Sequence, residues 1–309
     1  MRTMRTSSLR GLLESALLFG APLALVDCAY SSCPDNGVEP PLAESRTVDA
    51  SFADGGPLDA AQCTDVCAGN TGVITCVRES PDSVLCILQP YPCEGRRPAG
   101  LWPATRRPRS GFERHLADAA WLEAASVDAF RVLRHELHAH GAPRRLLRGA
   151  SRSARDERRH ARAAGALARR FGVAIPAVER ADSPRRSLEA IALENAVEGC
   201  VRETWGALVA LRQASRAGEL SVRATMRRIA RDEIRHAELA WAIDRWIAPR
   251  LTARQRGRVR EARVAAVAEL ARELRFALPR PERERLGLPG SAEASAMLAE
   301  LDRLVGLTT

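Results

Sequence analysis

The sequence predicts an all-α fold in which four long helices form a bundle, with additional C-terminal helices after it and a small irregular, disulfide-rich segment before it. Apolar residues make up 46% of the 309 residues and aromatic ones only 4%, so we expect a core built from Ala, Leu and Val. Apolar residues recur at helical spacing over residues 111–277. Seven of the eight cysteines lie between Cys28 and Cys93, where no helical period persists.

The positive charge of the chain comes from a single residue type. All 47 basic residues are arginine, and against 38 acidic residues they give a formal net charge of +9. Arginine clusters can face anionic lipid or nucleic acid. Because no aromatic-interleaved basic patch and no known nucleic-acid motif occurs in the sequence, we expect no nucleic-acid partner.

Residues 1–27 resemble a secretory signal peptide. An Arg-bearing start precedes an apolar run over 12–26, which is too short and too interrupted for a membrane span. Leu25 stands at the third position before Cys28, as in bacterial lipoprotein processing, whereas Asp27 departs from that pattern because a small residue is expected there. The alternatives are lipid on Cys28 as a membrane anchor, ordinary secretion, or no cleavage. We expect an exported protein, in the periplasm or anchored as a lipoprotein.

Residues 28–98 form a segment rich in Cys, Pro, Gly, Asp and Ser. Setting Cys28 aside leaves an even number of cysteines, as expected for a disulfide framework in an oxidising compartment. Zinc is the rival interpretation, but Cys63 and Cys67 lack a second close pair or a neighbouring His. The pairing is not determined by the sequence. The cysteines expected in disulfides are Cys33, Cys63, Cys67, Cys76, Cys86 and Cys93.

A Pro- and Arg-rich linker over residues 99–110 leads to the predicted bundle over 111–248. The four helices are separated by turn residues at Gly141, Gly172, Ser183, Gly218 and Pro249. Short connections after the first and third helices predict two antiparallel hairpins, and the longer link between them can cross over. Residues 249–309 are predicted to add a long amphipathic helix over about 252–278 and a short one over 291–305. These two helices are expected to pack on the bundle or on a partner chain. In the second case the protein would be an oligomer.

One six-residue pattern occurs twice in the predicted bundle. Arg155–His160 reads RDERRH, and Arg231–His236 reads RDEIRH. At nearly equal distances before them, the preceding helices carry Glu123 and Glu198. The bundle is therefore predicted to be an internal repeat of a helical hairpin.

The acidic residues of this repeat lie on the apolar stripes of their helices. In the fourth predicted helix, Glu233 and His236 share the stripe with Ile229 and Ile243, at spacings of three and four. Burying an isolated carboxylate would cost many kcal/mol or force it to hold a proton. Arg231 lies about 200° round the helix from Glu233 and cannot balance it. Metal ions are the better counter-charge.

One Glu from each of two helices, with Glu-x-x-His from each of the other two, resembles the ferritin-like di-iron carboxylate superfamily, including rubrerythrin-like proteins. The resemblance covers residues 111–248 and implies two metal ions, iron first, with manganese or zinc as alternatives. It implies Glu157 and Glu233 as bridging, catalytic carboxylates. One ion would be held mainly by Glu123, Glu157 and His160, and the other by Glu198, Glu233 and His236.

Two aspartates are expected to orient the histidines. Asp156 and Asp232 lie about 100° round their helices from the bridging Glu. Each could accept the spare ring N–H of the His on the neighbouring hairpin, Asp156 from His236 and Asp232 from His160. The alternative is ordinary exposed helix charge.

Other polar residues of the third predicted helix are less well placed. Glu194 lies one turn before Glu198 and is expected to be an additional ligand, a proton relay or a carboxylate at the rim. Glu203 lies about 140° from the ligand line and is expected to be solvated or, at most, behind the ligands. Cys200 is expected to be a small core residue.

A reduced pair of such ions could give electrons to O2 or peroxide. Tyr30 and Tyr91, the two tyrosines, lie outside the bundle, so no residue is available for a tyrosyl radical. The cysteine-rich segment has no paired Cys-x-x-Cys, so the electron donor is unknown. We expect a ferroxidase- or peroxidase-like oxidoreductase. The alternatives are a di-iron hydroxylase or N-oxygenase of a small substrate, and a structural or binding lipoprotein stabilised by metal.

Overall fold

The computed structural model describes residues 43–47, 73–80, 83–88, 96–98, 101, 110–180, 185–274 and 278–306, and only the backbone in the first three ranges. The predicted signal peptide lies outside these residues. So do the predicted lipidation site and four of the predicted disulfide cysteines: Cys28, Cys33, Cys63, Cys67 and Cys93.

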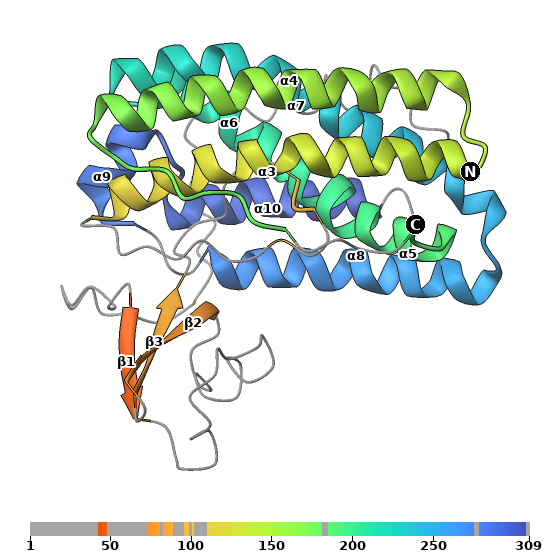
Figure 1. The fold of residues 1–309 in the computed structure, drawn as a ribbon, viewed down its shortest axis with the longest axis horizontal. Coiled ribbons are helices and arrows are strands. Elements are labelled where there is room, and N and C mark those ends of the chain that lie inside the picture. Colours follow the sequence, from red (N-terminus) through yellow and green to blue (C-terminus); the bar gives the residue numbers. More distant parts are fainter. Residues whose placement is uncertain are drawn as a thin grey trace.

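The described chain from residue 111 onward is predominantly helical, as predicted, and its long helices run side by side along the longest axis of the molecule (Figure 1). Helix α3 packs against α4, α6 against α7, and α4 against α7. The elements are α3 (Gly111–Ala139), α4 (Arg144–Arg170), α5 (Leu188–Glu194), the π-helix η2 (Asn195–Glu203), α6 (Thr204–Arg216), α7 (Leu220–Ile247), the 3₁₀ turn η3 (Ala248–Arg250), α8 (Ala253–Glu273), α9 (Arg280–Leu286) and α10 (Ser291–Gly306).

Several helix ends lie where the turn residues predict them. Ser110 caps α3, because its hydroxyl accepts a hydrogen bond from the Glu113 amide at 3.2 Å. After α3 and α4, Gly141 and Gly172 adopt φ of 73° and 70°, the left-handed region that glycine enters without a steric cost. These glycines stop the two helices and allow the chain to reverse.

The third predicted helix differs from expectation in two respects. It begins at Leu188, after the N-cap Ser187, rather than near Ser183. It is also interrupted by the π-helix η2, in which hydrogen bonds span five residues and each turn is wider than in an α-helix. At the start of η2, the buried Asn195 amide donates to the Ala240 carbonyl at 3.0 Å and ties the π-helix to α7.

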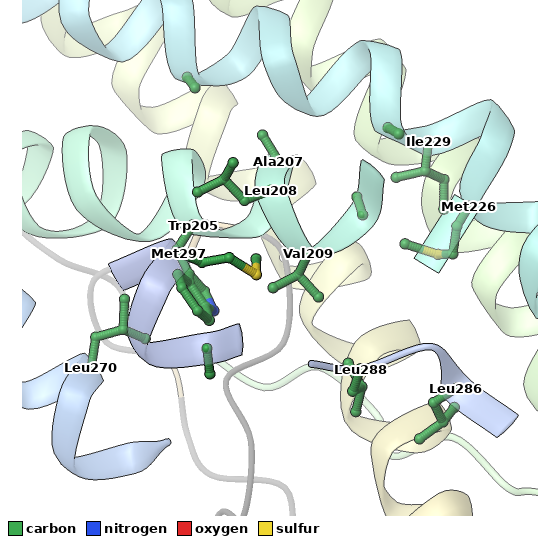
Figure 2. Packing of buried hydrophobic residues seen from close by; sticks show 14 of the residues in the cluster. Trp205, Ala207, Leu208, Val209, Met226, Ile229, Leu270, Leu286, Leu288 and Met297 are labelled. Atoms are coloured by element: carbon green, nitrogen blue, oxygen red, sulfur yellow. The ribbon is translucent and has the colours of Figure 1, made fainter. Parts of the chain in front are cut away.

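The apolar core is divided by a polar layer. Along α3 and α4, one cluster of buried side chains lies on each side of Glu123 and of the Glu157–His160 turn. Figure 2 shows the larger cluster, in which Trp205 and Leu208 of α6 pack with Met297 of α10. The polar layer is therefore enclosed by hydrophobic packing on both sides.

The C-terminal helices extend this core. Thr252 and Gln255 form a reciprocal capping box that starts α8, and α8 packs against η2 and α10. The sequence did not predict α9. Its end joins the α6–α7 turn, where the Gly218 amide donates to the Glu284 carbonyl at 2.9 Å.

The cysteine-rich segment was expected to be irregular, and the structure corrects this. It contains β1 (Ala43–Thr47), β2 (Val73–Ser80) and β3 (Ser83–Leu88), which form an antiparallel sheet in the order β1-β3-β2. The backbone positions of Cys76 and Cys86 are directly opposite each other on β2 and β3. The sequence suggested an irregular segment because it contains many residues that favour turns. The strands lie between these residues.

Among the described residues, no helix combines the length and the apolar character that crossing a membrane requires.

Candidate metal site

Buried acidic and histidine side chains from four elements meet between α3, α4, η2 and α7. They form two overlapping groups, and within each group the ligand atoms lie within 4.8 Å of one another. One group comprises Glu123, Glu157, His160 and Glu233, and the other comprises Glu203, Glu233 and His236. These groups could hold metal ions.

The two halves of the repeat interlock at this site. His160 Nδ1 lies 3.1 Å from Glu233 Oε1 and 3.3 Å from Glu123 Oε2. In the other half, His236 Nδ1 lies 3.0 Å from Glu157 Oε1 and 3.8 Å from Glu203 Oε2. Each histidine therefore faces the Glu of the other motif copy as well as the Glu of a neighbouring helix.

Glu157 and Glu233 are central in this arrangement. Glu157 approaches both histidines, His160 at 3.7 Å and His236 at 3.0 Å. Glu233 does the same, at 3.1 Å and 3.5 Å. This is the placement expected of carboxylates that reach two ligand groups at once.

Most of the inward-facing polar atoms have no hydrogen-bond partner among the described residues. Such atoms are costly in a protein interior unless a ligand or ion satisfies them. They are Glu123 Oε2, both Oε atoms of Glu157, Glu203 and Glu233, and Nδ1 of His160 and His236. Four carboxylates also balance the charge of two divalent cations when both histidines are neutral, so the donor set fits two such ions.

Of the two expected aspartate contacts, the one to His160 is a hydrogen bond, whereas the one to His236 is longer than a hydrogen bond. His160 Nε2 lies 3.1 Å from Asp232 Oδ2, and His236 Nε2 lies 3.7 Å from Asp156 Oδ2. An Nε2–H that donates to aspartate leaves the Nδ1 lone pair directed at the carboxylates. For His160, the tautomer that could bind a cation is thus selected from behind the site.

Two arginines complete this outer layer, and our sequence interpretation missed them. Arg159 donates to Asp156 at 2.6 Å and to Asp232 at 3.0 Å, while Arg235 donates to Asp156 at 3.1 Å and also pairs with Asp232. Each aspartate is therefore held by both arginines. The signal was available, because both motif copies have Arg immediately before His.

Glu203 is the main correction to the predicted ligand set. It is buried beside Glu233 and His236, whereas the predicted ligand Glu198 belongs to neither group. The 140° offset that had excluded Glu203 assumes α-helical turns. In the π-helix η2, positions five residues apart are about one turn apart, so Glu203 comes round to the face of Glu198 and one turn further along the helix.

Glu194 and Glu198 have basic partners instead. The buried Arg96, from the segment before the helices, donates from Nε and Nη2 to Glu194, both at 2.7 Å. The Arg97 amide donates to Glu198 at 3.1 Å, and Arg202 Nε lies 3.8 Å from Glu198 Oε1. Neither glutamate belongs to the two buried groups of ligand atoms, and each lies beside an arginine or a backbone donor instead.

The electrostatics reflect the crowding of carboxylates. Burial, together with neighbouring carboxylates, raises the pKa of Glu123 and of Glu203 well above the usual value. Burial alone would lower the pKa of His236, but Glu233 and Glu157 raise it well above normal. Burial would raise the pKa of Asp232, but hydrogen bonds from His160 and Arg235 lower it to about 2. In the metal-free protein, protons bound to these side chains would balance part of the negative charge that cations otherwise balance.

A partly enclosed pocket reaches the site beside Glu123. It lies between α3, α4, α6, α7 and α9, and its walls are mainly apolar. The space open to the centre of a water-sized molecule is about 20 Å³, which holds one or two molecules of that size. In Figure 2, Met226 and Ile229 of α7 and Leu286 of α9, three of the wall residues, lie at the same end of the core.

Comparison with family models, with curated proteins and with solved structures finds no match to this chain. The functional argument therefore rests on the residues of the site itself.

Proposed function

We propose that the helical domain is a ferritin-like di-metal carboxylate centre, in which iron is the first choice of metal. The observation that carries this proposal is the set of buried carboxylate and Nδ1 atoms without hydrogen-bond partners. Six side chains would hold the ions: Glu123, Glu157, His160, Glu203, Glu233 and His236. This mixture of carboxylate and imidazole suits iron or manganese, and zinc accepts the same ligand types.

We infer a ferroxidase- or peroxidase-like reaction, for which iron, when bound, would supply the electrons that reduce O2 or peroxide. The chain's own residues fix the ligand geometry, exclude bulk water and balance charge. The apolar clusters on both sides of the site shield it from bulk water, which strengthens the charge interactions within it. The Asp–Arg layer holds His160 in one tautomer and keeps Asp156 beside His236, so these side chains would be oriented before a cation binds.

The size of the pocket favours a small oxidant over an organic substrate. Room for one or two water-sized molecules suits O2 or peroxide. A hydroxylase or N-oxygenase would need space beside the site for the substrate as well, and the described pocket offers none of that size. The electron donor would have to be a separate molecule.

Export is also proposed, from the sequence of residues 1–98. The signal-like leader and the cysteine-rich segment both favour a periplasmic or lipid-anchored protein. An oxidising compartment would suit a protein that consumes peroxide outside the cytoplasm.

The deciding experiment is metal analysis of protein purified from its native envelope, followed by stopped-flow oxidation of the ferrous form. The proposal expects about two iron-class ions per chain and rapid consumption of O2 or peroxide. Glu157→Ala should abolish both, and the matched surface variant Glu300→Ala should change neither. A protein that retains zinc and is redox-silent would instead be a metal-stabilised scaffold.

A further inference from the structure

The segment before the helices places a buried charge beside η2. Arg96 is 1% exposed and donates from Nε and Nη2 to the two carboxylate oxygens of Glu194, both at 2.7 Å. Its guanidinium also lies over the Phe130 ring, 5.7 Å from the ring centroid. Burying a guanidinium is costly unless it is well paired. Arg96 is therefore built into the bundle and does not merely lie against its surface.

The next residue of the segment holds a second glutamate of the third predicted helix. The Arg97 amide donates to Glu198 Oε2 at 3.1 Å. The Arg96 carbonyl accepts a hydrogen bond from Ser126 Oγ of α3 at 2.9 Å, which fixes the backbone of the segment between α3 and η2. Two consecutive residues thus bind Glu194 and Glu198, which lie about one helical turn apart.

Arg96 also supports the π-helical form of η2. The Asn195 amide is held from both sides, because its Nδ2 donates to the Ala240 carbonyl at 3.0 Å and its Oδ1 accepts from Arg96 Nη2 at 3.3 Å. A Cβ added at Gly199 would lie only 2.8 Å from Ala240 Cβ and 3.3 Å from Arg96 Nη1. The helix η2 is therefore packed closely between the segment and α7. Because π-helical turns are rare in proteins, we expect such outside contacts to stabilise this one.

The geometry of η2 decides which glutamate can reach the metal site. Glu203 lies five residues after Glu198, about one π-helical turn, and joins the group of Glu233 and His236. Glu198 is bound instead by the Arg97 amide. If the segment released Glu198 and η2 became α-helical, Glu198 would take the inward position that its spacing predicts. Glu203 would then lie about 140° away from it.

We propose that residues 96 and 97 determine which glutamate of the third predicted helix binds metal. They hold Glu194 and Glu198 in other contacts and keep η2 π-helical, so that Glu203 becomes the ligand. Arg96 is a positioning residue, because it acts through η2. This inference rests on the proposed di-metal function, and it makes the segment before the helices part of the metal site.

The test asks whether the two glutamates exchange roles in the full-length protein when Arg96 is changed. Arg96→Met removes the charge and its hydrogen bonds at similar length. Bound Co²⁺ per chain after dialysis, and its affinity by competition with a chelator, are measured with Glu198→Ala and Glu203→Ala in each background. With Arg96 present, only Glu203→Ala should lose an ion. With Arg96→Met, Glu198→Ala should weaken the second ion roughly tenfold or more, a coupling expected within one network, and Glu203→Ala should lose most of its effect.

A second variant and a matched control separate ligand choice from stability. Arg96→Met/Glu194→Met removes both charges, so neither is left buried and unpaired, and it should exchange the two glutamates in the same way. Arg263→Met is the control. Arg263 is 2% exposed, pairs with Asp244 at 2.5 Å and lies 5.0 Å from the centroid of the Trp241 ring. Its loss should lower stability without changing which glutamate is needed.

The outcomes distinguish this inference from the proposed function. If Glu203 is still required and Glu198 still dispensable in both Arg96 variants, Arg96 only anchors the segment, and the inference is wrong while the di-metal function stands. If Arg263→Met also exchanges the two glutamates, the effect follows from lost stability and the inference is equally wrong. A wild-type protein that binds neither Co²⁺ nor iron would refute the proposed function, and the role of Arg96 would fall with it.

Discussion

His160 Nε2 lies 3.1 Å from Asp232 Oδ2, although the two residues belong to different helices and to different copies of the repeated motif. The reciprocal contact, from His236 Nε2 to Asp156 Oδ2, measures 3.7 Å. Each copy of the motif thus supplies a histidine to the site and places an aspartate beside the histidine of the other copy, with a hydrogen bond at His160 and a longer approach at His236. The two copies therefore meet at one site.

The aspartates should therefore control metal affinity from a distance. Asp232→Asn should weaken binding about tenfold or more, the usual scale for loss of a group behind a histidine ligand. Asp156→Asn should have a smaller effect, because its contact with His236 is longer. Competition with a chelator measures the affinities, and Asp128→Asn, which loses only a surface pair with Arg131, is the control. An equal loss in all three variants would contradict a role through the histidines.

For the third predicted helix, the structure indicates Glu203 as a metal ligand, whereas the internal repeat indicates Glu198. Glu203→Ala should bind about one ion fewer per chain, because Glu203 lies in the group with Glu233 and His236. Glu198→Ala should keep both ions, since Glu198 already accepts from the Arg97 amide. Metal content after dialysis decides between the two residues. Loss of an ion from the Glu198 variant alone would restore the repeat-based assignment.

Removing the metal should lower the free energy of unfolding, because the crowded carboxylates then lose the cations that balance their charge. At metal concentrations about a thousandfold above Kd, the loss in free energy of unfolding is about 4 kcal/mol. Glu203→Gln should be neutral or stabilising in the metal-free protein, because burial raises the pKa of Glu203 and a proton already neutralises it there. Urea unfolding with and without chelator tests both statements. Equal stability of the two wild-type forms would mean that no cation is bound among these groups.

Buried His115 should make stability depend on pH in mild acid. Burial lowers its pKa from 6.5 to about 4. The unfolded chain therefore binds a proton that the folded protein does not, and stability falls as pH decreases from about 6.5 to about 4. The complete loss is worth at most roughly 3 kcal/mol.

The effect of His115 on stability must be separated from that of Asp118 by a variant. Burial raises the pKa of Asp118 to about 6, so its contribution to the free energy of unfolding changes with pH in the opposite direction. Urea unfolding of the wild type and of His115→Phe at pH 7 and pH 4.5 isolates the histidine. We expect the wild type to lose more stability than the variant over this range. Parallel losses in both proteins would show that His115 titrates normally in the fold.

The register of the small sheet selects one disulfide among the predicted cysteines. Directly opposed positions in antiparallel strands have Cα atoms about 4.5–5.5 Å apart, which is within the range that a disulfide spans. Peptide mapping without reduction should therefore find Cys76 linked to Cys86. Buried Cys200 should remain a thiol that reacts only after denaturation. Linkage of Cys76 to any other cysteine would rule out this pairing.

The sequence by itself determined the helical class, most helix ends and five of the six residues in the buried site. Helical periodicity places Glu157, His160, Glu233 and His236 on inward faces, and glycine and proline mark the turns regardless of what packs around them. The same reasoning predicted the aspartate contacts across the hairpins, because position on a helix follows from spacing alone when turns are regular.

The tertiary structure decided which glutamate of the third helix faces the site. Spacing could not, because η2 departs from α-helical geometry and changes the direction of every side chain after it. Asn195 joins η2 to α7, and Arg96 binds Glu194. Both contacts link segments that lie far apart in the chain. Local sequence does not contain such contacts, so the exchange of Glu198 for Glu203 became visible only in the folded protein.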